Sequence, residues 1–269
     1  MTKKETKKVT MTVTTDENGF PKYVSGNENI TNEKTQIICI LDRSGSMAEG
    51  GIIYESINGF NNFLEEQKKP KDEATITVAL FDDRYELLYD DVDIRKVEKI
   101  TYDIWYPRGT TALFDAIGKT INTVRAKHTT LGSNKPAKVL VCIVTDGKEN
   151  ASQEYTSRDK IKSLIKECED DNWNFIYLAA NQNAFDVGTS FGISGSNTYT
   201  YTADIDGVYN MSMTLNSASL SYRDMNSSSR DFKKKSKQLI NNPNDNDKPE
   251  DDGTGNTSTS NTSNSFSIC

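Results

Sequence analysis

Three oxygen-bearing side chains stand at alternate positions directly after an apolar run of the chain. Asp42, Ser44 and Ser46 follow the apolar residues 37–41. Such a run predicts a buried strand, and alternate spacing in the turn after it lets the three side chains converge. Carboxylate and hydroxyl oxygens suit Mg²⁺, Mn²⁺ or Ca²⁺ better than Zn²⁺. The pattern therefore indicates a metal site, with a helix cap as the alternative for a serine-rich turn.

Two later loops offer further oxygen ligands. Thr110 directly follows Gly109 in a loop before a helical pattern, and Thr111 is the competing candidate in the same loop. Asp146 follows the apolar run 139–143 within a Val-Thr-Asp-Gly sequence. Because open parallel sheets gather ligands at the carboxyl ends of their strands, we expect the three loops to point at one place.

The combination of Asp-x-Ser-x-Ser, Gly-Thr and Thr-Asp-Gly resembles the von Willebrand factor A (vWA) family and its metal-ion-dependent adhesion site, over residues 35–225. The resemblance implies a binding module in which the ion keeps an open position for an Asp or Glu of a protein partner. We expect Mg²⁺, with Mn²⁺ or Ca²⁺ as alternatives. The ligands that the resemblance implies are the hydroxyls of Ser44, Ser46 and Thr110 and, directly or through water, the carboxylates of Asp42 and Asp146.

A finer resemblance concerns residues 172–185, which are similar to the closing segment of standalone vWA proteins of bacteria and phages. It implies a role in an intracellular assembly, with an AAA+ ATPase or a phage or stress component as partner. No apolar stretch of signal-peptide length follows the first lysines, and no segment approaches a membrane span. We therefore expect a cytoplasmic protein, in the host cytoplasm if it is phage-encoded.

Between residues 35 and 225, apolar residues recur with the spacing of strands and of helices in alternation. This order predicts parallel strands joined by right-handed crossovers. The expected class is α/β, a doubly wound, mostly parallel sheet flanked by helices on both faces. Expected strands cover 37–41, 74–81, 85–89, 138–145, 175–179 and 199–201; apolar helical stripes run over 53–64, 113–124, 161–168 and about 207–223, with a short helical or turn segment at 94–97.

The rest of the chain divides by composition. In residues 1–34, alternating apolar residues and threonines before an Asn-Gly pair predict a β-hairpin, although a loose extension has the same composition. Residues 226–240 read as a basic linker or helix end. Residues 241–269 lack apolar side chains almost throughout, which predicts a disordered tail. Its five acids against one lysine leave a net charge of −4 of the chain's −7, so we expect no nucleic-acid partner.

The alternatives to a binding module are a metal-dependent phosphoesterase and a structural module with a vestigial metal site. The only histidine, His128, is expected at the solvated surface, away from the site. Glu149 and Asp115 are expected to cap or solvate helices. We therefore predict that the protein is not an enzyme. Trp105 and Tyr106 precede the threonine loop, where they either pack beneath it or form an exposed docking rim.

Cysteines at three positions fall in apolar patterns and predict buried free thiols. These are Cys39, Cys142 and Cys168, while Cys269 ends the chain. A vWA sheet would place the strands of Cys39 and Cys142 side by side, so a disulfide between them is the alternative. Free thiols fit the reducing compartment expected above.

Overall fold

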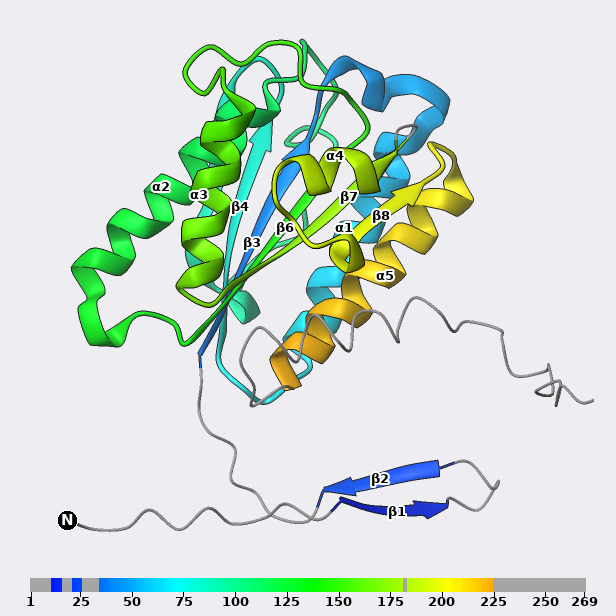
Figure 1. The fold of residues 1–269 in the computed structure, drawn as a ribbon. Coiled ribbons are helices and arrows are strands. Elements are labelled where there is room, and N and C mark those ends of the chain that lie inside the picture. Colours follow the sequence, from blue (N-terminus) through cyan, green and yellow to red (C-terminus); the bar gives the residue numbers. More distant parts are fainter. Residues whose placement is uncertain (1–10, 16–20, 26–33, 181–182, 225–269) are drawn as a thin grey trace, which may run out of the picture.

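The computed structural model describes residues 11–15, 21–25, 34–180 and 183–224. Its main feature is a six-stranded sheet in the order β5-β4-β3-β6-β7-β8 (Figure 1). The edge strand β5 runs antiparallel to β4, and the other neighbours pair in parallel. The strands are β3 (Thr35–Asp42), β4 (Ala74–Phe81), β5 (Tyr85–Asp93), β6 (Lys138–Thr145), β7 (Trp173–Ala180) and β8 (Thr198–Tyr201).

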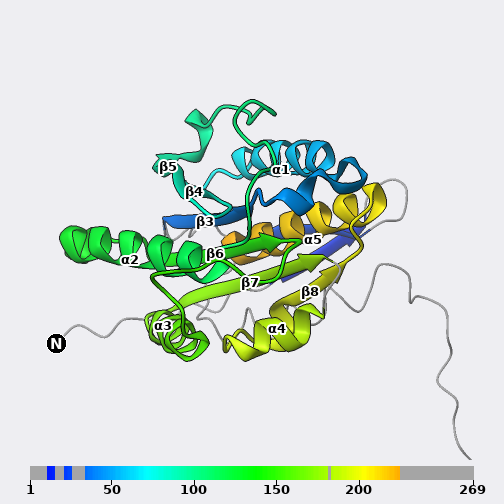
Figure 2. The same cartoon turned by 90° about the horizontal axis from the view of Figure 1, so that it is seen from above.

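Helices cover both faces of this sheet (Figure 2). α1 and α5 share an apolar core with Ile37, Cys39 and Leu41 of β3, while α2, α3 and α4 pack with Ile38 and Ile40 on the other face. Every residue of β3 is buried, as an apolar run in a doubly covered sheet requires. The predicted doubly wound, mostly parallel α/β fold is confirmed. The helices are α1 (Ile52–Lys68), α2 (Leu113–Leu131), α3 (Arg158–Asp170), α4 (Ala184–Ser190) and α5 (Ile205–Asp224), with short 3₁₀ turns η1 (Gly45–Gly51), η2 (Ile94–Lys96), η3 (Gly132–Asn134) and η4 (Gly195–Asn197).

The first described residues form a separate two-stranded sheet. β1 (Met11–Thr15) pairs antiparallel with β2 (Pro21–Ser25), from Met11 opposite Ser25 to Thr15 opposite Pro21. The basic segment 226–240 and the tail 241–269 lie outside the described residues.

Two elements differ from the sequence expectation. β5 continues to Asp93 rather than ending at Tyr89, through register shifts against β4 near Val78. α4 was not expected, because seven residues are too few to show an apolar stripe. Its local signal was the cap, in which the Asn183 side chain accepts a hydrogen bond from the Asp186 N–H at 3.3 Å.

The expectation that His128 is solvated was wrong. His128 is only 8% exposed, its Nε2 lies 2.7 Å from Gln36 Oε1, and its ring meets Trp173 edge-on. α2 extends beyond its apolar stripe, so its last turn still lies against the sheet. Burial lowers the pKa of His128.

The two ends of the large domain meet at the amino edge of the sheet. Lys138, the first residue of β6, donates its backbone N–H to the Lys34 carbonyl at 3.4 Å and its Nζ to the Arg223 carbonyl at 2.7 Å. The Arg223 guanidinium in turn binds both carboxylate oxygens of Asp72. The end of α5 is thereby fastened beside the start of β3.

The cysteines of the described residues are buried and unpaired. Cys39 and Cys142 are register partners on β3 and β6, and both they and Cys168 are buried free thiols. Cys269 lies outside the described residues. Among the described helices, none combines the length and apolar character needed to cross a membrane.

Candidate metal centre

Three loops at the carboxyl edge of the sheet carry the predicted ligands (Figure 1). β3 and β6 pair in parallel up to Leu41 opposite Val144, so the residues that follow each strand emerge side by side. The third loop precedes α2. Its Gly109 carbonyl accepts a hydrogen bond from the Gly45 N–H at 3.1 Å, which brings this loop against the first.

Asp42 is the most buried of the candidate ligands, with 1% of its surface exposed. Its Oδ1 accepts a hydrogen bond from the Ser44 N–H at 2.7 Å, and its Oδ2 accepts one from Thr145 Oγ1 at 2.5 Å. These bonds fix the carboxylate at the end of β3. Thr145 was missed from the sequence, although it stands inside the Thr-Asp-Gly motif.

A chain of hydroxyls joins the first loop to the loop after β6. Ser44 Oγ lies 3.1 Å from Ser46 Oγ, and Ser46 Oγ donates to Asp146 Oδ1 at 2.8 Å. The structure therefore brings four of the five predicted residues into one hydrogen-bonded cluster, since Asp42 binds the Ser44 backbone.

The fifth ligand position favours Thr111, the competing candidate, over Thr110. A Cβ added to Gly147 would lie 2.6 Å from Thr111 Oγ1 and 3.4 Å from Ser44 Oγ, so the Thr111 hydroxyl stands beside the cluster. Asn150 holds Thr111 at two points, accepting from its N–H at 2.9 Å and donating to its carbonyl at 3.0 Å. Thr111 is buried, whereas Thr110 is exposed.

Burial shifts the ionisation of both carboxylates in the cluster. Burial, and then the charge of Asp42, raise the pKa of Asp146 to about 7, and burial also raises the pKa of Asp42. Neither carboxylate forms a salt bridge with any described residue. Arg43, next to Asp42 in sequence, pairs instead with Asp82 at 2.9 Å and Glu86 at 2.8 Å. Two neighbouring acids without a basic partner fit a divalent cation.

The donor set also restricts the kind of metal. Within the described part of the chain, no three His, Cys, Asp or Glu side chains gather into a metal-binding group. The two carboxylates therefore combine with hydroxyls rather than with nitrogen or sulfur ligands. Such a set fits hard cations such as Mg²⁺ or Mn²⁺.

Of the two aromatic residues before the threonine loop, Trp105 is buried and Tyr106 is exposed. Trp105 is buried, and its Nε1 donates to the Asp42 carbonyl at 2.9 Å. Tyr106 is 38% exposed. The exposed rings of Tyr54, in α1, and Tyr102 stack with their centroids 5.1 Å apart. Trp105 thus supports Asp42 from within the fold, whereas Tyr106, Tyr54 and Tyr102 are exposed.

The nearby acids outside the cluster bind backbone amides. Glu149 accepts from the Phe114 N–H at 2.8 Å, in the first turn of α2, as expected of a helix cap. Asp115 accepts from the N–H groups of residues 153–155. Both acids therefore tie the loop after β6 to the start of α2.

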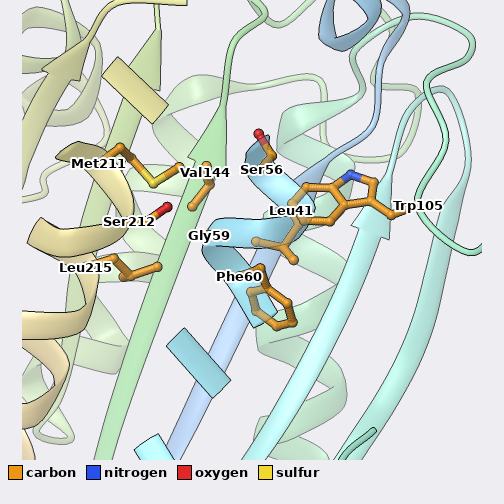
Figure 3. Close-up of a pocket in the computed structure, with 9 residues that line it drawn as sticks. All are labelled: Leu41, Ser56, Gly59, Phe60, Trp105, Val144, Met211, Ser212 and Leu215. Carbon is orange, nitrogen blue, oxygen red and sulfur yellow. The ribbon is translucent and has the colours of Figure 1, made fainter. Parts of the chain in front are cut away.

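A small, mostly apolar cavity lies between the sheet, α1 and α5 (Figure 3). It is lined by Leu41, Ser56, Gly59, Phe60, Trp105, Val144, Met211, Ser212 and Leu215. A Cβ on Gly59 would lie 1.9 Å from Ser212 Oγ, so glycine permits the close approach of α1 and α5. The cavity includes no candidate ligand and is separate from the metal centre.

Comparison with known proteins places the fold. The mussel byssus protein PTMP1 with a zinc-occupied MIDAS motif superimposes with a TM-score of 0.50 and 16% identity, over 69% of this chain and 46% of that one. The fold is that of a vWA domain. No protein-family model and no curated protein matches the sequence of this chain.

Two further solved structures are similar to this vWA domain. The ArnB paralog VWA2 from Sulfolobus acidocaldarius shares 18% identity over 68% of this chain and 44% of that one, with a TM-score of 0.47. Manganese-loaded TRAP from Plasmodium vivax shares 19% identity over 67% and 72%, with a TM-score of 0.49. The chain spans less than half the length of PTMP1 and of VWA2.

Proposed function

We propose that the protein is a metal-ion-dependent protein-binding module. The observation that carries the proposal is the pair of carboxylates, Asp42 and Asp146, which lack a basic partner among the described residues and stand among three hydroxyls. The residues that would hold the ion are Asp42, Ser44, Ser46, Thr111 and Asp146, with Thr110 as the alternative hydroxyl.

When bound, a divalent ion supplies positive charge with open positions that an Asp or Glu of a partner can fill. The composition of the ligand set determines how much of that charge remains for a partner. Three of the proposed donors are neutral hydroxyls, so only two carboxylates offset the charge of the ion. Trp105 and Thr145 hold Asp42 in place through hydrogen bonds to its carbonyl and its carboxylate. The exposed rings of Tyr106, Tyr54 and Tyr102 would contact the partner.

The proposal extends to a cytoplasmic role in an assembly, with an AAA+ ATPase or a phage or stress component as partner. This part rests on the resemblance of residues 172–185 to standalone vWA proteins.

An affinity pulldown from the native cell tests the proposal. Wild type, Asp42→Ala and a matched control, Asp170→Ala, are compared with and without EDTA. Asp170 forms only an exposed ion pair with Lys166 on α3, so its loss should leave binding unchanged. We expect EDTA and Asp42→Ala to remove the same partner. A partner retained in both conditions would contradict the proposal.

A second experiment identifies the partner's contact. Replacing the partner's acid should weaken the complex, and combining this change with Asp42→Ala should add little, because a carboxylate has nothing to coordinate once the ion is lost. Fully additive losses would place the contact elsewhere. Metal-dependent hydrolysis of a phosphoester that Asp42→Ala abolishes would favour the enzyme instead.

A further inference from the structure

Asp82 directly follows β4, one strand away from the candidate ligands, and its side chain is fully buried. Its Oδ2 accepts hydrogen bonds from Arg43 Nε at 2.9 Å and from Arg108 Nε at 2.5 Å. Its Oδ1 accepts one from the Arg84 N–H at 2.6 Å. Both carboxylate oxygens are therefore engaged, and two guanidinium groups share one of them.

The two arginines belong to different ligand loops. Arg43 stands in the loop after β3, and Arg108 stands in the loop that carries Thr111. The Arg108 N–H donates to the Arg43 carbonyl, and the Ala112 N–H donates to the Asp82 carbonyl, both at 2.8 Å. Asp82 thus binds the loop after β3 through Arg43. In the other loop it binds Arg108 and Ala112, which lie on either side of Thr111 in the sequence.

The same contacts determine which acids the guanidinium groups of Arg43 and Arg108 pair with. Arg43 is 1% exposed, and besides Asp82 it pairs with the half-exposed Glu86 at 2.8 Å. Together Arg43, Arg108, Asp82 and Glu86 carry no net charge. Both arginines are thereby directed to Asp82 and do not neutralise the carboxylates of the metal site.

We propose that Asp82 is a positioning residue of the metal site: it joins the loops of Arg43 and Arg108 and keeps both guanidinium groups away from the site carboxylates. The inference rests on the proposed function, since it concerns the geometry of that same site. Groups that orient metal ligands without touching the ion commonly contribute about 10- to 100-fold to metal affinity.

The test is calorimetric titration of the full chain with Mg²⁺, comparing wild type with Asp82→Asn and Arg108→Gln. The two substitutions change the charge near the site in opposite directions. A field effect alone would weaken binding in Asp82→Asn and strengthen it in Arg108→Gln. Both substitutions disrupt the side-chain link that Asp82 makes between the loops, while the backbone hydrogen bonds remain. We therefore expect both to weaken binding, by about tenfold or more in Asp82→Asn.

Two controls separate positioning from other effects. Glu86→Gln removes the other acidic partner of Arg43 without touching Arg108, and it should change the affinity less than about twofold because Glu86 is half exposed. Ile117→Val removes a buried methylene from α2 and should lower the melting temperature without changing the affinity. If Asp82→Asn does not fold, Arg108→Gln still breaks the link while Asp82 keeps Arg43.

The outcomes are distinct. Opposite shifts in the two variants, unchanged affinities, or an equal loss in Glu86→Gln would overturn the positioning role while leaving the metal site in place. A wild-type protein that binds neither Mg²⁺ nor Mn²⁺ would overturn the proposed function, and this inference with it.

Discussion

Ser46 Oγ donates a hydrogen bond to Asp146 Oδ1 at 2.8 Å, although 100 positions separate the two residues in the chain. Because Ser46 has a single hydroxyl hydrogen, it accepts the hydrogen bond from Ser44 Oγ at 3.1 Å, and one lone pair of its oxygen stays free for a cation. The bond also joins the turn after β3 to the turn after β6, so it fixes two candidate ligands with one contact.

The first prediction concerns the carboxylates. Asp42→Ala and Asp146→Ala should each abolish Mg²⁺ and Mn²⁺ binding, because each removes a charged ligand that no other described side chain replaces. Titration calorimetry measures the affinity, and circular dichroism checks that the sheet is intact. Wild-type affinity in both folded variants would show that the ion binds elsewhere.

The second prediction decides between the two threonines. Thr111→Val should weaken metal binding by about tenfold or more, since valine keeps the shape and removes a hydroxyl that stands beside Ser44. Thr110→Val is the matched control, and its affinity should stay within about twofold of wild type because Thr110 is exposed. The reverse order would return the ligand role to Thr110.

The third prediction concerns space inside the cluster. In Gly147→Ala the added methyl would lie 2.6 Å from Thr111 Oγ1, so the threonine must move and metal affinity should fall by about tenfold or more. Gly132→Ala serves as control. Its φ of 55° strains an alanine, but nothing lies within 4 Å of its Cβ. It should lower the melting temperature and leave the affinity unchanged.

The fourth prediction concerns pH. Burial and the charge of Asp42 raise the pKa of Asp146 to about 7 in the metal-free protein, from 3.8. This group therefore contributes stability that is fully present below pH 3.8 and is lost as the pH rises through about 7. Thermal unfolding of the EDTA-treated protein should show the loss, and Asp146→Asn should reduce it.

Metal binding should follow the opposite direction, because the ion requires the carboxylate form. The apparent affinity should rise by about tenfold between pH 6 and pH 8, with about one proton released for each ion bound at pH 6. Calorimetry in two buffers of different ionisation enthalpy measures that release. Equal affinities at both pH values without proton release would contradict the raised pKa.

The sequence predicts the four central strands well because they are buried along their whole length. Apolar residues and threonines fill 74–81 and all of 138–145 except Lys138, and these runs match β4 and β6. The edge strand β5 is only partly buried, so its sequence does not mark its end. α4 depends on a local cap and β8 contacts rather than on an apolar stripe.

The candidate site could be predicted only in part. Asp42 and Asp146 follow the ends of buried strands, which the sequence marks. The choice of Thr111 depends on two hydrogen bonds to Asn150, and such a contact between distant loops has no local pattern. In the sequence, Asp82 is only an acidic residue between two expected strands. The fold shows that Arg43 and Arg108 both donate hydrogen bonds to its carboxylate.

The contacts of Lys138 determine how tension would pass through the molecule. The chain enters the six-stranded domain at Lys34 and leaves it at the end of α5, and Lys138 binds the carbonyls of both Lys34 and Arg223 at the amino edge of the sheet. A force applied through the two flanking segments would act first on the hydrogen bonds that Lys138 makes to Lys34 and Arg223. The candidate metal centre, at the carboxyl edge, would stay out of the load path, so its residues could keep their arrangement while the flanks are stretched apart.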